Sequence, residues 1–144
     1  MSEGAPLDPA ALLEAAYEAR DRAYAPYSRF RVGAALLTRG GLVIPGCNVE
    51  NVSFGLTVCA ERVAVNNAVA QGLRDFVAVA IVTGTPHATP PCGMCRQVLY
   101  EFAPDLTVVL PPSLASGEPE LLTLRDFLPR GFGPNDLAAG VDHE

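Results

Sequence analysis

Apolar residues recur at helical spacing in three segments of the chain. The first covers 9–24, with Asp8 placed to cap its first turn and Pro26 placed to end it. The other two cover 58–71 and 92–102, and each is followed by a helix-ending glycine or proline within two residues. We predict three main helices over these ranges, with short helical turns near the C-terminus at 125–128 and 134–138.

Strand patterns lie between the predicted helices. The run 76–83 is apolar at nearly every position without alternation, which is typical of a central strand covered on both faces. Two other stretches flank the turn signal Arg39-Gly40-Gly41 and predict a hairpin. The hairpin strands cover 30–37 and 42–47. Two further short strands are predicted over 106–110 and 121–124. The order of elements predicts an α/β fold, a three-layer α/β/α sandwich around a mixed five-stranded sheet.

Length and composition favour one domain. The chain has 144 residues, of which 49% are hydrophobic, so it can bury a core without disulfide bonds. No repeat or long linker divides it. We therefore expect a single domain over 1–144.

Charge and the terminal sequence narrow the possible partners. The formal net charge is −6, and no cluster of Lys or Arg is present that would neutralise a phosphate backbone, so nucleic acid is not an expected partner. The N-terminal residues lack the features of a signal peptide, and no apolar run reaches the length of a membrane span. We expect a cytoplasmic protein, in which cysteines stay reduced and serve metal binding or catalysis more often than cross-linking.

Three cysteines lie where helices are predicted to begin. Cys92 and Cys95 form a Cys-x-x-Cys motif after a proline-rich loop, and such a pair serves either redox chemistry or metal binding. A thioredoxin-like role would leave Cys59 without a function. If both helices start at the same edge of the sheet, the three sulfurs meet, as a zinc site requires.

The fourth ligand separates a structural zinc site from a catalytic one. Cys47 would close a structural site of four cysteines. Glu61 favours the catalytic alternative, because it lies two residues after Cys59 and can act as a general base beside a metal-bound water. Arg62 is either an ordinary surface residue or a donor that offsets the charge of the thiolates.

Five stretches of the chain resemble one family. Cys59-Ala-Glu61 followed by Pro91-Cys-Gly-Met-Cys95 resembles the zinc-dependent nucleoside deaminases that have three cysteine ligands. The order and spacing of the stretches are similar to those of the small homotetrameric cytidine deaminases. The matching stretches are Tyr27–Ala35, Gly46–Asn51, Cys59–Arg62, Pro91–Gln97 and Leu128–Phe132.

The resemblance implies a role for each matched residue. It implies one Zn²⁺ per chain, held by Cys59, Cys92 and Cys95, with Glu61 as the proton shuttle. It also implies that five residues bind substrate: Asn48 and Glu50 at the sugar, Phe30 and Phe54 along the pocket, and Phe132 at the site of a neighbouring subunit. Core packing is the alternative for Phe30 and Phe54, and turn chemistry or surface charge is the alternative for Asn48 and Glu50. Met94 and Arg130 depart from the family pattern, which affects the shape of the lid over the pocket.

The implied activity is hydrolytic deamination of cytidine and 2′-deoxycytidine to the uridines plus ammonia, in pyrimidine salvage, by a homotetramer whose sites are shared between subunits. Three alternatives remain at this point. A deaminase of the blasticidin S type shares the zinc motif. Deaminases of nucleotides or transfer RNA more often use a histidine zinc ligand in a His-x-Glu motif and need basic residues to bind phosphate, whereas this chain has Cys-x-Glu and an excess of acidic residues. A zinc module closed by Cys47 would have no enzymatic activity.

Overall fold

The computed structural model describes residues 6–113 and 117–141. Residues 1–5, which contain most of the N-terminal sequence used above to infer location, lie outside the described residues. The elements in chain order are α1 (Pro9–Arg20), β1 (Gly33–Thr38), β2 (Val43–Cys47), the 3₁₀ helix η1 (Phe54–Leu56), α2 (Ala60–Ala70), β3 (Phe76–Val82), α3 (Gly93–Phe102), β4 (Thr107–Leu110), β5 (Glu120–Thr123), α4 (Leu124–Phe127) and α5 (Pro134–Ala139).

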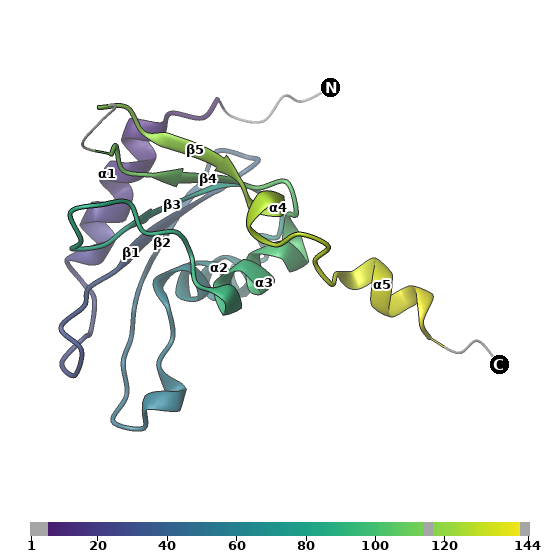
Figure 1. Cartoon of the computed structure of the whole chain (residues 1–144), viewed down its shortest axis with the longest axis horizontal. Helices are drawn as coiled ribbons and strands as arrows, with labels where there is room; N and C mark the ends of the chain where they lie inside the picture. The colour runs from purple at the N-terminus through teal and green to yellow at the C-terminus, as the bar shows by residue number, and fades with distance from the viewer. Residues whose placement is uncertain (1–5, 114–116, 142–144) are drawn as a thin grey trace.

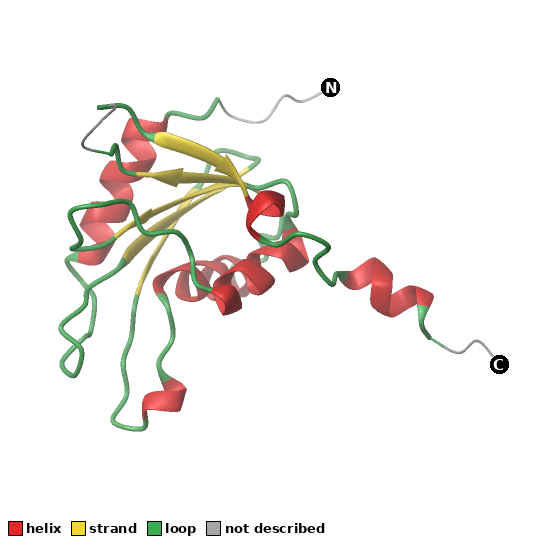
Figure 2. Ribbon diagram, viewed as in Figure 1, coloured by secondary structure: helices red, strands yellow, loops and turns green. Residues whose placement is uncertain are grey.

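One sheet organises these elements. Its strand order is β2-β1-β3-β4-β5, in which β3 and β4 are parallel and the other neighbours are antiparallel. Helix α1 covers one face of the sheet, whereas α2 and α3 cover the other (Figures 1 and 2). The predicted three-layer α/β/α sandwich around a mixed five-stranded sheet is confirmed.

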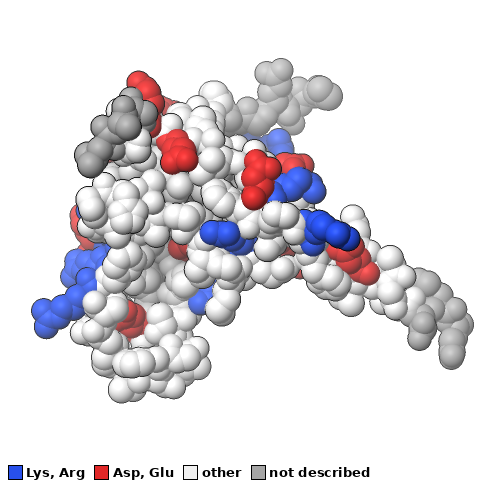
Figure 3. Space-filling model, viewed as in Figure 1, with Lys and Arg blue, Asp and Glu red and all other residues white. Residues whose placement is uncertain are grey.

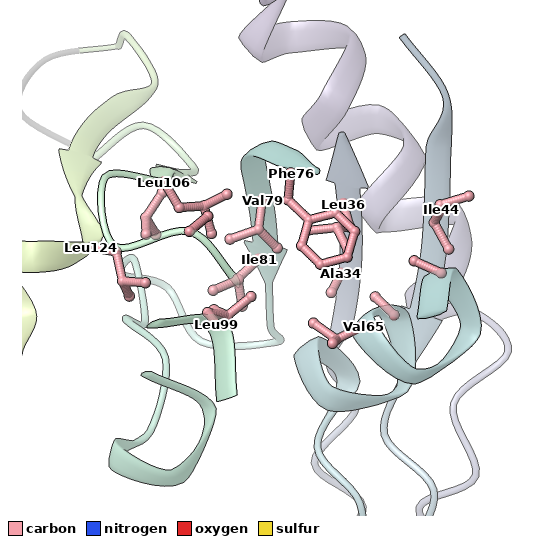
Figure 4. Packing of buried hydrophobic residues seen from close by; sticks show 14 of the residues in the cluster. Ala34, Leu36, Ile44, Val65, Phe76, Val79, Ile81, Leu99, Leu106 and Leu124 are labelled. Carbon is pink, nitrogen blue, oxygen red and sulfur yellow. The ribbon is translucent and has the colours of Figure 1, made fainter. Parts of the chain in front are cut away.

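Strand β3 is central, as its unbroken apolar run predicts. Val79 and Ile81 pack into the core on the side of α2 and α3, together with Leu36 and Leu99 (Figure 4). The alternate residues of β3 pack against α1 in a second cluster that contains Ala78, Ala80 and Val82. Because both faces are covered, apolar side chains at successive positions are all buried, and the sequence shows no alternation.

Helix α1 is shorter than its sequence pattern predicts. It ends at Arg20, and the chain beyond it turns toward the segment after β2. The Tyr24 amide donates to the Asn48 carbonyl at 3.0 Å, and the Glu50 amide donates to the Tyr24 carbonyl at 2.9 Å. The predicted extension to residue 24 is wrong because this pairing with a distant segment replaces the next helical turn.

The start of α2 is set by a close approach to β2. A Cβ atom at Gly46 would lie 2.2 Å from the carbonyl oxygen of Ala60 and 2.5 Å from the Ala64 nitrogen, so a side chain at this position would collide with the helix backbone. Glycine therefore allows the first turn of α2 to rest directly on the strand. This contact fixes the place where Cys59 and Glu61 enter the site.

Two parts of the chain extend from the body of the molecule. The segment 48–58, here called the arm, carries η1 at its tip, and α5 projects at the C-terminal end (Figure 1). Large apolar side chains are exposed on both parts. They are Val49, Val52, Phe54 and Leu56 on the arm, and Phe132, Leu137 and Val141 near α5.

The described helices are short. The longest, α1, has 12 residues, whereas a helix needs about 20 to cross a bilayer. Within 6–113 and 117–141, no helix is both long enough and apolar enough to do so.

Candidate functional site

Three cysteine sulfurs meet where α2 and α3 begin. Cys59 is the N-cap of α2, Cys92 is the N-cap of α3, and Cys95 lies in the first turn of α3. The Sγ atoms of Cys59 and Cys92 are 3.9 Å apart, and those of Cys92 and Cys95 are 3.4 Å apart. All three sulfurs lie within 4.8 Å of one another, so the predicted gathering of the thiols is confirmed.

The spacing of the sulfurs fits a zinc ion. Tetrahedral zinc with Zn–S bonds of about 2.3 Å places its sulfur ligands about 3.8 Å apart, close to the separations of 3.9 and 3.4 Å between neighbouring pairs. The amide groups and dipoles at two helix N-termini also favour the thiolate form that binds metal. Three thiolates leave one tetrahedral position open, which is typical of a catalytic site.

Cys47 is not part of this cluster among the described residues. It lies at the end of β2, opposite Gly33 of β1, in a separate hollow beside Ala19 and Arg22. Burial raises the pKa of the Cys47 thiol, and its position in this hollow keeps it apart from the three sulfurs. The alternative of a structural site closed by four cysteines is therefore not supported.

Arg62 contacts the sulfur cluster. Its Nη2 atom donates to Cys59 Sγ at 3.7 Å and to the carbonyl oxygen of Thr57 at 3.3 Å. A hydrogen bond from the Cys95 thiol, aided by Arg62, lowers the pKa of Cys59 to about 5, and the same bond raises the pKa of Cys95. Cys59 is thus the first of these two thiols to become a thiolate, and the guanidinium stabilises its charge.

Replacing Arg62 by Gln is expected to weaken zinc binding by about 10- to 100-fold, the usual effect of losing a group that hydrogen bonds to a metal ligand. Competition with a chromophoric chelator measures the dissociation constant. Arg74→Gln, an equal change of charge at an exposed position just after α2, is the matched control. Equal zinc affinities in the two variants would contradict a role for Arg62 at the thiolates.

Glu61 is a buried carboxyl group beside the cluster. It is the second residue of α2, its exposed fraction is only 5%, and it lines the cavity described below. Burial raises the pKa of Glu61, and the nearby Cys59 thiolate acts in the same direction. The carboxyl group therefore holds a proton at a higher pH than an exposed glutamic acid does, as a group that both accepts and releases protons requires.

A cavity of about 300 Å³ opens beside the sulfurs, which is at the small end of the range for ligand sites. Its walls combine apolar side chains with a few polar ones. They are Ser28, Phe30, Val32, Asn48, Glu50, Thr57, Cys59, Glu61, Ile81, Thr83, Thr89, Pro90 and Cys92. The catalytic candidate and two of the metal-ligand candidates thus share one cavity with three of the predicted substrate-binding residues.

Asn48 and Glu50 are held rigidly at the cavity. The Asn48 side chain accepts from the Val32 amide at 2.9 Å and donates to the Phe30 carbonyl at 2.7 Å. The Glu50 carboxylate accepts from the amides of Tyr27 and Ser28 at 2.9 and 3.1 Å, and from the Ser28 hydroxyl. These bonds, with that of the Ser28 hydroxyl first, lower the pKa of Glu50. Each side chain keeps further hydrogen-bonding capacity for a ligand.

Phe54 and Phe132 lie outside the main cavity within this chain. Phe54 is on the arm, lines an adjoining hollow of about 220 Å³ and packs against Tyr27 with ring centroids 5.7 Å apart. Phe132 follows α4 with 60% of its surface exposed, and its carbonyl accepts from Gln97 at 2.9 Å. Phe30, by contrast, is part of the cavity wall.

Two supporting residues were not identified from the sequence. Ser28 bonds to Glu50 across 22 residues, and Arg96 donates to the Pro91 carbonyl at 2.7 Å and to the Phe127 carbonyl at 3.0 Å. Arg96 therefore anchors the chain just before Cys92. Both residues lie inside stretches that carry the family resemblance, which was the available signal, but their partners are too distant in sequence to be inferred.

Comparison with known proteins finds one family. Residues 8–110 match the model of the cytidine and deoxycytidylate deaminase zinc-binding region. A cytidine deaminase of Halalkalibacterium halodurans is 47% identical over 131 residues, which cover 91% of this chain and 98% of that protein. A cytidine deaminase of Sporosarcina psychrophila is 42% identical over 136 residues, which cover 94% and 99%.

Solved structures agree with the sequence comparisons. The crystal structure of a cytidine deaminase from Burkholderia pseudomallei superimposes with a TM-score of 0.80 at 49% identity, covering 88% of this chain and all of that one. That of a cytidine deaminase from Mycobacterium tuberculosis gives a TM-score of 0.78 at 42% identity, covering 89% and 99%. Both the sequence and the fold of this chain are therefore similar to those of cytidine deaminases.

Proposed function

Because the chain belongs to the cytidine and deoxycytidylate deaminase family, we propose that it hydrolyses cytidine and 2′-deoxycytidine to uridine and 2′-deoxyuridine with release of ammonia. The observation that carries this proposal is the buried carboxyl group of Glu61 in the same cavity as Cys59 and Cys92, two of the three clustered cysteines. The reaction is a step in the salvage of pyrimidine nucleosides. One domain over 1–144 performs it.

Glu61 moves the protons of the reaction. Zinc, held by Cys59, Cys92 and Cys95, supplies Lewis-acid chemistry that makes water acidic near neutral pH. The Glu61 carboxylate takes a proton from the attacking water and delivers it to N3 of the pyrimidine, which makes C4 more electrophilic. It then takes the remaining proton of that water, now on the oxygen bonded to C4, and carries it to the exocyclic nitrogen, so that the C4–N bond breaks, the C4=O bond forms and ammonia leaves.

Asn48, Glu50 and Phe30 orient the nucleoside. The carboxylate of Glu50 accepts a hydrogen bond from a sugar hydroxyl, chiefly the 3′-hydroxyl, while the free N–H of Asn48 donates to the sugar. Because both side chains are already bonded to the backbone between Tyr27 and Val32, little side-chain entropy is lost when substrate binds. Phe30 supplies an apolar wall.

A substrate panel tests the proposed activity. We expect the purified, zinc-loaded protein to convert both cytidine and deoxycytidine and to leave adenosine unchanged. Cytidine monophosphate should be converted at least about 100-fold less efficiently, because the described residues that line the cavity include no basic one. Ultraviolet absorbance follows the loss of the amino group. Turnover of blasticidin S in preference to cytidine would refute the proposed substrate.

We also propose a homotetramer with sites shared between subunits. The arm and the C-terminal segment expose large apolar side chains, and the arm region is largely uncharged on the face drawn in Figure 3. Such surface favours contact with another protein surface. Phe132 lies outside its own chain's cavity, which leaves it available to close the cavity of a neighbour.

A Phe132→Ala variant tests the shared site. We expect KM for cytidine to rise by about 10-fold or more, because a buried aromatic contact in an interface contributes about 1–2 kcal/mol. Light scattering should detect a tetramer for the unmodified protein. Leu121→Ala, a change at an exposed residue of the edge strand β5, is the control that should leave KM unchanged. A monomer with full activity would refute the shared site.

We infer that the protein resides in the cytoplasm. All four cysteines lie within the described residues and none of them forms a disulfide bond, which supports a reducing compartment. The expected binding partner is the small nucleoside substrate. We expect no binding to nucleic acid or to a membrane, because the formal net charge of −6 disfavours contact with phosphate groups.

A further inference from the structure

Three threonine hydroxyls form a hydrogen-bonded network behind one wall of the cavity. Thr83 follows β3, and Thr85 and Thr89 lie in the loop that leads to Cys92. The Oγ1 atoms of Thr83 and Thr85 are 2.8 Å apart, those of Thr85 and Thr89 are 2.9 Å apart, and those of Thr83 and Thr89 are 3.2 Å apart. All three side chains are partly buried.

The network separates two hollows. Thr83 and Thr89 line the catalytic cavity, whereas Thr85 does not. All three threonines line a second, polar hollow of about 140 Å³, together with His87. Arg20 at the end of α1 donates to the Thr83 carbonyl and holds the first threonine in place. Thr85 can therefore influence the cavity only through its two neighbours.

The number of hydroxyl protons determines their directions. Each threonine hydroxyl has one proton to donate. Thr85 donates its proton to the His87 carbonyl oxygen at 2.6 Å. Its short contacts with Thr83 and Thr89 then require both of these residues to donate to Thr85. The longer Thr83–Thr89 contact is left without a proton.

As a result, the cavity faces lone pairs and not protons. Thr83 Oγ1 also accepts from the Thr85 amide at 3.2 Å, which fixes its orientation further. With the protons of Thr83 and Thr85 directed elsewhere, no described group donates to Thr89 Oγ1, so this oxygen keeps acceptor capacity. Thr89 and Pro90 line the cavity and lead directly to Cys92, so the accepting wall adjoins the metal-binding end.

We propose that Thr85 acts as a positioning residue for substrate specificity: by taking the protons of Thr83 and Thr89, it makes this wall an acceptor that favours a base with an amino group over one with an oxygen at the same position. The inference rests on the proposed function, in which the substrate carries an amino group at C4 and the product an oxygen. The same wall would accept a hydrogen bond from the amino group of the substrate. It would weaken binding of the product, because neither the threonine lone pairs nor the C4 oxygen has a proton to donate to the other.

Equilibrium binding of cytidine and uridine tests the network without turnover. Both dissociation constants are measured on zinc-loaded protein that carries Glu61→Gln, alone and combined with Thr85→Val, Thr85→Ser or Thr89→Val. Zinc content is measured for every variant. Valine keeps the shape of threonine and removes its hydroxyl, whereas serine keeps the hydroxyl.

Thr85→Val frees the protons of Thr83 and Thr89 to point at the cavity. We expect cytidine to bind about 3- to 10-fold more weakly, as for the loss of one hydrogen bond, and uridine to bind more tightly. Thr89→Val should weaken cytidine binding by a similar factor without weakening uridine binding. Thr85→Ser should stay within about twofold of the parent for both ligands.

The outcomes separate the inference from the proposed function. A parent protein that binds zinc but not cytidine would refute the proposed function itself. If cytidine binds, an unchanged ratio of the two dissociation constants in Thr85→Val would refute the role of the network alone. If Thr85→Val fails to fold, the Thr89→Val variant provides the test. An equal loss of affinity for cytidine and uridine in Thr89→Val would show a merely structural effect and would refute the role of the network.

Discussion

Replacing Glu61 by Gln is expected to lower kcat for cytidine by about 10³-fold or more while zinc content and thermal stability stay close to those of the unmodified protein. Glutamine occupies the same volume and keeps an oxygen at the cavity, but its amide can neither accept nor release a proton near neutral pH. Because the proposed mechanism assigns two proton transfers to Glu61, both steps should slow. Steady-state kinetics by ultraviolet absorbance and metal analysis by emission spectroscopy measure the two quantities.

Glu101→Gln is the matched control for this variant. It makes the same change in charge on the exposed side of α3, outside the cavity. We expect its kcat and zinc content to equal those of the unmodified protein. A Glu61→Gln enzyme with kcat within about tenfold of the control would remove Glu61 from proton transfer.

Replacing Cys92 by Ala is expected to reduce bound zinc from about one ion per chain to less than about a tenth after dialysis, with complete loss of activity. Two remaining thiolates make a poor zinc site in water. Cys92 is the best of the three ligands to test because its side chain is exposed, so that the substitution leaves the buried core intact. Circular dichroism and metal analysis on the same sample separate loss of metal from loss of fold.

Cys47→Ala is the matched control, since it removes a thiol that lies outside the cluster. We expect it to retain zinc and activity. Stoichiometric zinc in Cys92→Ala, or loss of zinc in Cys47→Ala, would contradict the ligand assignment. Cys59→Ala and Cys95→Ala should also lose zinc, although buried Cys95 adds a cost from the small cavity that its removal leaves.

The sequence predicts the architecture well because its strongest patterns are local. The unbroken apolar run of β3 identifies the central strand, and the glycine and proline signals mark the ends of α2 and α3 to within a few residues. The prediction for α1 extends too far because Tyr24 pairs with Asn48 and Glu50, which are distant in sequence. Helix propensity, which is a property of each residue and its close neighbours, carries no information about this competing long-range pairing.

The sequence alone could not settle the status of Cys47 and Arg62. Four cysteines allowed either a closed or an open metal site, and the register of β1 with β2 places Cys47 in a separate hollow. Arg62 could have faced solvent, but the first turn of α2 points its guanidinium back to Cys59. Both outcomes depend on how α2 rests on β2 at Gly46.

By itself, the sequence determined the order of helices and strands, the thiol chemistry suited to zinc and the carboxyl group beside it, because local periodicity and residue type carry this information. Only the tertiary structure decided which groups meet. The meeting of α2 and α3 brings three sulfurs within 4.8 Å, Ser28 bonds to Glu50, and the hydroxyl oxygens of Thr83, Thr85 and Thr89 lie within 3.2 Å of one another. The physical reason is that strand register and helix packing set distances between residues far apart in the chain, and hydrogen-bond directions follow from those distances.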